Sequence, residues 1–550
     1  MTKFIVKRFL PMLLVAVLLL CAAVACAETV DDNALMKTLI TPEEFAAKVN
    51  GTKIQKLTDE PVTFTVWLDV GGNGALGKLI DKLEDMDLVK TMAEKTGVSL
   101  EFKPAPIGQQ ETSFSLMAIS GDWTDIIIGF DTMYADGPDA AIEEGIIYEL
   151  TDLIEKNMPN YSKARKESEF RTLGTLTDAG NQPYICNFSY KDFLGLRAGG
   201  LIIRKDLLNK LGMEMPVTLD DLHTFLSRCH DELGMTRAFG MNYNGINKYN
   251  ALNASFDHGA NTNTGGEIVF QVDGKIQYAP LTEGYREYLT TMAQWYQEGL
   301  IDPDFTSTLT FDDGIALMTS NQCAVLGENM YVIDYVNGLG KAVDPDFEFV
   351  VCPSPVRNVG DQLHISCPDG NNVQKTCAIS TKCKNVDLLL QYIDQYYTDE
   401  GFLLCNFGTE GKTYHVEDGL PKFEDIILNN PNGTKTDTLS AYTAPVTWFY
   451  EGVVCRDADY IMLDRAAVYT SNSDNEWQLP PINLNSDEKA IYSELWGDIS
   501  SYVDEMTVKF IMGLEPMDNY DTFVTRLKEE FRVEELIAAY QSALDRYYAR

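Results

Sequence analysis

Apolar residues between positions 62 and 134 follow two periods, one typical of strands and one typical of helices. A spacing of three and four residues, as on one face of a helix, relates Leu83, Met86, Val89, Met92 and Ala93. Gly97 predicts the end of this helix, because glycine readily adopts the left-handed conformation that closes one. Residues 98–102 resemble a strand, a second helix is predicted to end at Gly121, and the isoleucines at 126–128 form a continuous apolar run.

Together with a strand predicted at 63–67, these segments make a β-α-β-α-β unit, which requires parallel strands. Ligands of such sheets bind beyond the carboxyl ends of the strands. In this chain those ends carry residues 67–73 and 129–134, which are rich in aromatic, Asp, Asn and Gly residues. We therefore expect a binding site for a polar small molecule at this edge of the sheet.

The same two periods continue through the rest of the chain. Residues 199–203 form an apolar strand that leads into a helix ended by Gly212. Thr218 and Asp221 predict a capped start for the next helix, since both side chains can satisfy free backbone N–H groups. Asp-Gly at 273–274 predicts a hairpin, and the C-terminal third shows helical amphipathic periodicity.

Length and charge narrow the class of protein. A chain of 550 residues is too long for one hydrophobic core, so two or more lobes are expected. The 82 Asp and Glu residues outnumber 44 Lys and Arg, and the formal net charge is −38. So acidic a surface repels nucleic acid and anionic lipid, and we expect no nucleic-acid partner.

Residues 1–27 have the features of a secretory signal peptide, with basic residues before an apolar run that ends in small residues. Residues 23–26 fit a lipobox, in which Cys26 would be acylated and become the first mature residue. Ordinary cleavage before Glu28 fits as well. We expect an extracytoplasmic protein, either a lipoprotein on the plasma membrane or a secreted one. Residues 28–57 are interpreted as a leader segment, whose short helix is capped by Thr41.

Catalytic and metal-binding motifs do not emerge from the sequence. The five histidines are scattered, and zinc-ligand spacing, nucleophile elbows, phosphate-binding loops and calcium-loop spacing are not found. Nine of the eleven cysteines lie beyond the signal region, without paired spacing, and most are interpreted as small buried hydrophobes. The prediction is therefore no enzyme, no metal and no cofactor.

Several stretches together resemble one family, the extracellular solute-binding proteins of ABC importers, family 1, large lipoprotein type. The matching stretches span residues 60 to 550 in the family's order: TGVSLEF with SLMAISGDWTDII, LIIRKDLLNKLGMEMPVTLDDL, the DGKI hairpin with MAQWYQEGLIDPDF, NFGTEGKTYHVEDG, and LPPINLNSDEKAIYSELWGDISSYVDEMTVKFIMG. Trp123 and Leu207 depart from the usual pattern, in which Leu-Pro and Trp stand at these places. Neither departure threatens the fold.

The resemblance implies an α/β fold of the periplasmic-binding-protein type II, a two-lobe clamshell in which each lobe is a mainly parallel sheet flanked by helices. Lobe 1 would comprise 58–195 plus 366–410, and lobe 2 would comprise 196–365 plus 411–550. Three crossovers would join the lobes, and the ligand would bind between them. Arg204, at the first crossover, is expected to pair with an acid, and Trp295 is expected to pack in the core.

Candidate ligand-binding residues lie at the strand ends and in one aromatic run. They are Trp67, Asp69, Asp131, Tyr134, Asn242, Tyr243, Asn244 and Trp448. A tryptophan stacks on the C–H face of a sugar, and an aspartate accepts a pair of hydroxyl donors, so both suit a neutral carbohydrate. The alternative for Trp67 is core packing, and for Asp69 a turn. As ligand platform, Trp67 replaced by alanine would weaken binding far more than stability.

These observations favour a binding protein that captures a small or oligomeric solute and delivers it to an ABC permease, with carbohydrate as the expected cargo. Its partners would be that ligand, the permease subunits and, if Cys26 is acylated, the membrane. We expect a monomer. Two alternatives stay open: a secreted glycan hydrolase, and the same fold used as a sensor for a histidine kinase. Peptides and polyols also stay open as ligands.

Overall fold

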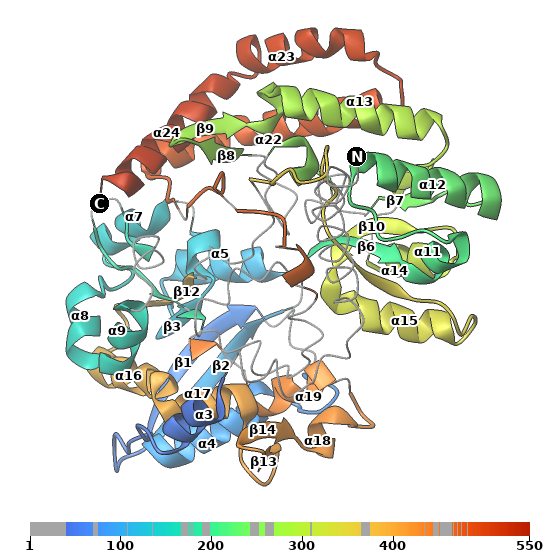
Figure 1. Cartoon of the computed structure of the whole chain (residues 1–550). Helices are drawn as coiled ribbons and strands as arrows, with labels where there is room; N and C mark the ends of the chain where they lie inside the picture. Colours follow the sequence, from blue (N-terminus) through green and yellow to red (C-terminus); the bar gives the residue numbers. More distant parts are fainter. Residues whose placement is uncertain are drawn as a thin grey trace, which may run out of the picture.

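The computed structural model describes most of the chain from residue 40 onward. The described residues are 40–69, 75–106, 108–134, 136–166, 175–177, 180–186, 188–189, 199–241, 252–258, 269–307, 311–364, 375–433, 435–443, 450–451, 465, 467–469, 471–474, 476–480 and 482–549. Two separate sheets, of five and four strands, organise these residues into two lobes (Figure 1). No helix in this part of the chain is long and apolar enough to cross a membrane.

The first sheet contains the β-α-β-α-β unit that the sequence predicts. Its strand order is β2-β1-β3-β12-β4, so the first strand of the unit lies in the middle. The strands and helices of this lobe are β1 Val62–Asp69, α4 Asp87–Thr96, β2 Val98–Ala105, α5 Gln110–Ser120, β3 Ile126–Ile128, α6 Phe130–Met133, α7 Gly137–Glu143, α8 Thr151–Asn157, α9 Pro159–Lys166, β4 Ile185–Cys186, β12 Lys375–Ile379, α16 Val386–Asp394 and α17 Asp399–Phe407. Strand β1 pairs in parallel with β2 over its whole length and with β3 at Val66 and Trp67.

The second sheet has the order β11-β6-β10-β7. The strands and helices around it are β6 Gly199–Arg204, α11 Lys205–Leu211, α12 Leu219–Leu233, β7 Phe239–Gly240, β8 Val269–Val272, β9 Lys275–Tyr278, α13 Glu283–Gln297, α14 Phe311–Thr319, β10 Val325–Asn329, α15 Ile333–Lys341 and β11 Phe349–Cys352. Along β6, Leu201 and Ile203 contribute to one apolar cluster and Ile202 to another. This sheet is therefore buried on both faces, as its uninterrupted apolar sequence predicts.

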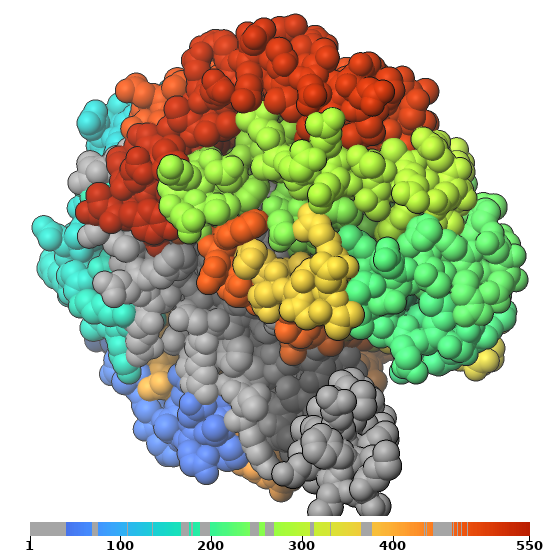
Figure 2. All heavy atoms as spheres, turned by 45° about the horizontal axis from the view of Figure 1, so that its top comes forward, coloured from blue at the N-terminus to red at the C-terminus, as the bar shows by residue number. Residues whose placement is uncertain are grey.

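Three C-terminal helices belong to the core of the second lobe. They are α22 Ser486–Ile511, α23 Tyr520–Glu529 and α24 Val533–Tyr548. Figures 1 and 2 show them in red along α13 on one side of the molecule, and their apolar residues join those of α13 in one cluster. Trp295 on α13 is buried in this cluster, which confirms the predicted core role.

A smaller hydrophobic cluster packs on α17 of the first lobe. It comprises α3 Pro42–Val49, β13 Tyr414–Glu417, β14 Leu420–Phe423, α18 Asp425–Leu428 and α19 Lys435–Tyr442 on α17. Lys78 of the first lobe pairs with Asp437 of α19 at 3.0 Å. Residues 411–443, which the resemblance assigns to lobe 2, thus pack here on lobe 1. The short strands β5 Phe188–Ser189 and β15 Tyr450–Glu451 pair with each other.

Several local predictions are confirmed. Thr41 and Thr218 cap their helices, and each forms the reciprocal bonds of a capping box. Gly97 and Gly212 end theirs in the left-handed conformation, and Asp273 with Gly274 turns the hairpin between β8 and β9 with positive φ at both residues. These signals are local, so the sequence alone contains them.

The sheets are mixed, whereas the resemblance predicts mainly parallel ones. In the second sheet β6 runs antiparallel to both β10 and β11, and only β7 pairs in parallel with β10. In the first sheet β12 runs antiparallel to both of its neighbours. Strand β12 follows β11 of the other sheet in the chain, so no helix crossover within its own sheet imposes a parallel direction on it.

Arg204 pairs with an acid, as predicted, and is almost fully buried at 1% exposure. Its guanidinium donates to both carboxylate oxygens of Asp206 at 2.7 Å and to Asn321 at 2.9 Å, and lies 3.9 Å from the ring centre of Phe347. Replacing Arg204 by lysine should lower the free energy of unfolding by about 1–2 kcal/mol, because an ammonium group cannot reproduce this fork. Urea denaturation measures the loss.

The half-exposed pair of Arg228 with Glu232 provides the control. Arg228 replaced by lysine should change the free energy of unfolding by less than about 0.5 kcal/mol, since exposed pairs on one helix contribute little. Equal losses in the two variants would contradict a special role for the buried fork.

A candidate ligand site between the two lobes

A cavity of about 560 Å³ lies where the first lobe meets the start of α22. Its size falls within the range typical of small-molecule sites. First-lobe residues on its wall are Asp131, Thr132, Gly137, Pro138, Asp139, Thr175, Leu176, Thr177, Pro183 and Tyr184. The facing residues are Ile482, Asn483, Leu484, Asn485, Ser486, Lys489 and Tyr492. The cavity is therefore shared between the two lobes.

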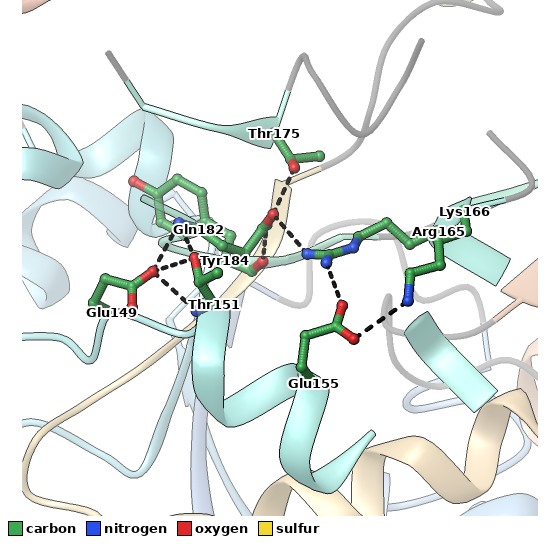
Figure 3. A network of polar contacts seen from close by, with 8 residues as sticks. All are labelled: Glu149, Thr151, Glu155, Arg165, Lys166, Thr175, Gln182 and Tyr184. Atoms are coloured by element: carbon green, nitrogen blue, oxygen red, sulfur yellow. Dashed lines mark hydrogen bonds and ion pairs between the residues drawn. The ribbon is translucent and has the colours of Figure 1, made fainter. Parts of the chain in front are cut away.

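A buried polar network holds the first-lobe wall in place (Figure 3). Gln182, which is fully buried, accepts a hydrogen bond from the Thr175 hydroxyl at 2.7 Å and one from Arg165 at 3.4 Å. Its amide nitrogen donates to the Tyr184 carbonyl at 2.6 Å. Arg165 in turn donates to Glu155 at 2.8 Å. Two residues of the cavity wall are thus fixed through one glutamine.

Tyr184, which lines this wall, has an unsatisfied hydroxyl. The residue is only 2% exposed, and its hydroxyl has no hydrogen-bond partner among the described residues. Burial raises its pKa well above the usual value, and the carboxylates of Asp131 and Asp139 add to the shift. The phenol therefore stays protonated and keeps a hydrogen-bond donor beside the cavity.

The opposite wall is the start of α22, which is built around a capping box. Asn485 accepts a hydrogen bond from the Glu488 backbone, and the Glu488 carboxylate accepts one from Asn485, both at 2.9 Å. Arg546 of α24 donates two hydrogen bonds of 2.6 Å to the same carboxylate and one of 3.3 Å to the Asn483 carbonyl. The helix start is therefore held by two independent elements.

The lobes touch at the rim of the cavity. The Asn483 side chain donates to the Leu176 carbonyl at 3.1 Å, across the boundary between them. Gly137 begins α7 with φ of +82°, and a Cβ placed there would lie 3.2 Å from Nζ of Lys489. A side chain at Gly137 would be strained and would crowd this lysine, so glycine permits the close approach.

The cavity combines aromatic surface with groups that donate and accept hydrogen bonds. Tyr184 and Tyr492 supply rings, Asp131 and Asp139 supply acceptors, and Asn483 and Asn485 supply amides. Tyr492 also stacks on Trp496, with ring centres 5.7 Å apart and planes 14° apart. This combination suits a polyhydroxylated solute, whose C–H faces pack on rings while its hydroxyls bond to carboxylates and amides.

The three first-lobe residues predicted from the sequence whose side chains the structure describes have different environments. Asp131 lies on the cavity wall. Tyr134 stacks on Phe130, and its hydroxyl donates to Glu144 at 2.8 Å; burial first and then this bond raise its pKa to about 12. Trp67 is buried at 4% exposure in the lobe core, which favours the packing alternative. We therefore leave Trp67 out of the proposed binding surface.

The remaining candidates lie outside what the structure describes. For Asp69 the backbone at the end of β1 is described but the side chain is not. Asn242, Tyr243, Asn244, Trp448 and Cys26 fall outside the described residues altogether. These positions stay predictions.

Sequence reasoning missed the residues that α22 and the strand β4 region contribute. A cap signal of Asn followed three residues later by Glu precedes an apolar helical pattern at 485–488, and it locates the start of α22. That signal cannot show that the helix start faces Asp131, because the two lie far apart in the chain. Tyr184 likewise reads from sequence as an ordinary strand residue.

Two lobes, each with a mixed sheet, that share one polar and aromatic cavity define a two-lobed solute-binding protein. A comparison with known families agrees: the family described as bacterial extracellular solute-binding protein matches residues 79–401. The chain belongs to that family. It is a substrate-binding protein of the ABC transporter type and not an enzyme, so the hydrolase alternative is set aside.

Similar proteins are distant in sequence. The fructooligosaccharide ABC transporter substrate-binding protein FusA of Streptococcus pneumoniae is 22% identical over 84% of this chain and 87% of its own length. Lipoprotein LipO of Bacillus subtilis is 23% identical over 62% of this chain and 66% of its own.

Among solved structures, FusA in complex with kestose has a TM-score of 0.69 at 20% identity and covers 88% of this chain and 99% of its own. An HMO-binding ABC-transporter-associated solute-binding protein from Bifidobacterium longum infantis has a TM-score of 0.71 at 17% identity, with coverages of 89% and 99%. At these identities the likeness shows the fold, and confirms the α/β two-lobe architecture.

Proposed function

We propose that this protein captures an oligosaccharide between its two lobes and delivers it to an ABC permease. The observation that carries the proposal is the cavity shared by the two lobes, which Asp131 and Tyr184 line from the first lobe and Tyr492 lines from the second. The names of FusA and of the Bifidobacterium protein, which refer to fructooligosaccharide and to HMO binding, support the choice of ligand class.

Binding on one wall would precede closure of the other. A solute held by Asp131 and Tyr184 would present its free face to Asn485 and Tyr492, and contacts to both walls exist only when the lobes are closed. The ligand can shift the equilibrium toward the closed form only by this difference in affinity. Closure would then give the permease a surface that distinguishes loaded from empty protein.

Attachment to the membrane surface forms a second part of the proposal. LipO, a relative named as a lipoprotein, supports acylation at Cys26. Release of a protein that begins at Glu28 is the other outcome. Mass spectrometry of the mature N-terminus, compared between the wild type and a Cys26→Ala variant, distinguishes the two.

A thermal-shift screen tests the ligand class. We expect a set of oligosaccharides to raise Tm, because a ligand at 100 times its Kd stabilises the folded state by about 2.7 kcal/mol. Peptides serve as controls, and chromatography of the incubated sugar should show no product. A rise in Tm with peptides but with none of the sugars would overturn the carbohydrate assignment.

A further inference from the structure

Three potential metal ligands, none of which lines the interlobe cavity, converge on the second lobe. They are His364, Asp474 and Glu476, and one ligand atom of each lies within 4.8 Å of the other two. The histidine is separated from the aspartate by 110 residues. Spacing along the sequence therefore gives no hint of the group, which explains why no metal is predicted from sequence.

Backbone hydrogen bonds hold the two segments together. Leu363 donates to the Asn472 carbonyl at 2.9 Å, and Asp474 donates to the Leu363 carbonyl at 3.0 Å. Trp477 donates to the His364 carbonyl at 3.0 Å, and its ring centre lies 4.6 Å from that of the histidine. The three side chains thus project from a fixed frame, so little ordering is needed for an ion to bind.

The ligand atoms of the three side chains are near enough to one another for one ion to reach all of them. Nδ1 of His364 lies 3.1 Å from one carboxylate oxygen of Asp474, and the other oxygen accepts from the Glu476 backbone at 3.0 Å. Both His364 and Asp474 side chains are about one third exposed, at 33% and 31%, so solvent and ions can reach them. The two carboxylates and one imidazole form a donor set typical of zinc and similar divalent ions.

An adjoining cavity of about 200 Å³ gives independent support. His364 lines it, together with Ser255, which is 1% exposed and whose hydroxyl has no partner among the described residues. The Arg357 guanidinium on the same wall is already paired with Asp257 at 2.7 Å and Glu287 at 2.6 Å. Its charge is therefore compensated, so this arginine does not oppose a cation bound at His364.

We infer that His364, Asp474 and Glu476 form a site for a divalent transition-metal ion, with Zn²⁺ as its representative. The ion would tie the segment that follows β11 to the segment that leads into α22. The second of these continues into the wall of the interlobe cavity, so metal binding would stabilise that wall. The metal site does not depend on the proposed function, so zinc binding can be confirmed or refuted whatever solute the protein binds.

Calorimetric titration of the tag-free, chelator-treated protein with ZnCl₂ tests the inference. We expect one saturable site in the wild type. A His364→Gln variant should bind zinc at least about tenfold more weakly, because even the loss of a residue that only supports a metal ligand typically weakens binding by that factor. Asp474→Asn should behave alike. Tm measured in the absence of zinc checks that both variants are folded.

His415 offers a matched control. It also lies near two carboxylates, Glu424 at 2.9 Å and Glu417 at 3.6 Å, but each contacts a different ring nitrogen, so the three cannot share one ion. His415→Gln should leave the titration unchanged. Absence of a saturable site in the wild type, or equal losses in the His364 and His415 variants, would overturn the inference.

Discussion

Replacing Trp67 by alanine is expected to lower the free energy of unfolding by about 3–5 kcal/mol, the usual range for removing a buried aromatic side chain. The indole is 4% exposed, and its N–H donates to the Ser113 hydroxyl at 3.1 Å. Its ring meets Phe114 edge-on, with centres 5.6 Å apart. The change therefore leaves a cavity in the core of the first lobe and removes the hydrogen bond to Ser113.

From the sequence, Trp67 is a candidate ligand platform with core packing as the alternative, and this expectation follows the alternative. Urea denaturation of the variant measures its stability, and ligand titration at a temperature at which it remains folded measures its affinity. Together they distinguish core packing from a role as ligand platform. The packing role predicts a large loss of stability with affinity within about threefold of the wild type. Trp67→Phe, which keeps a ring, should lose less, about 1–2 kcal/mol. A large loss of ligand affinity in Trp67→Ala, with unchanged stability, would instead show that Trp67 stacks on the ligand.

Trp67 shows what a single sequence can and cannot locate. Its position in a strand, and the pairing of that strand with Ile126–Ile128, follow from local apolar patterns. Whether its ring faces the core or the ligand depends on Ser113 and Phe114, which belong to α5. The packing of a helix on a sheet sets that choice, and it is not encoded in the residues next to Trp67.

The candidate site is harder to predict for the same reason. Asp131 follows a predicted strand and is a candidate because ligands of such sheets bind beyond the strand ends. Its partners on the opposite wall, Asn485 and Tyr492, belong to the start of a helix more than 350 residues later. Arg546, from yet another helix, bonds to Glu488 between them. Such long-range convergence is visible only once the lobes are assembled.

Replacing Tyr492 by alanine should weaken oligosaccharide binding roughly thirtyfold, which corresponds to about 2 kcal/mol, the cost typical of an aromatic residue at the centre of a binding site. Tyr492 lines the interlobe cavity from the α22 side, and we expect its ring to cover a face of the sugar there. Tyr548 on α24 is 59% exposed and is not among the residues that line the cavity. Tyr548→Ala should leave affinity unchanged, and calorimetric titration compares the two.

A Tyr184→Phe variant removes only the phenol oxygen and completes the test. Because that hydroxyl is buried without a partner in the described structure, its loss should leave stability unchanged or slightly raised. Affinity should fall by about 0.5–1.5 kcal/mol, or roughly two- to tenfold, if a ligand oxygen accepts its hydrogen bond. Reduced affinity in both tyrosine variants, with stability retained, would place the ligand between Tyr184 and Tyr492. Unchanged affinity in both would move the binding surface away from this cavity.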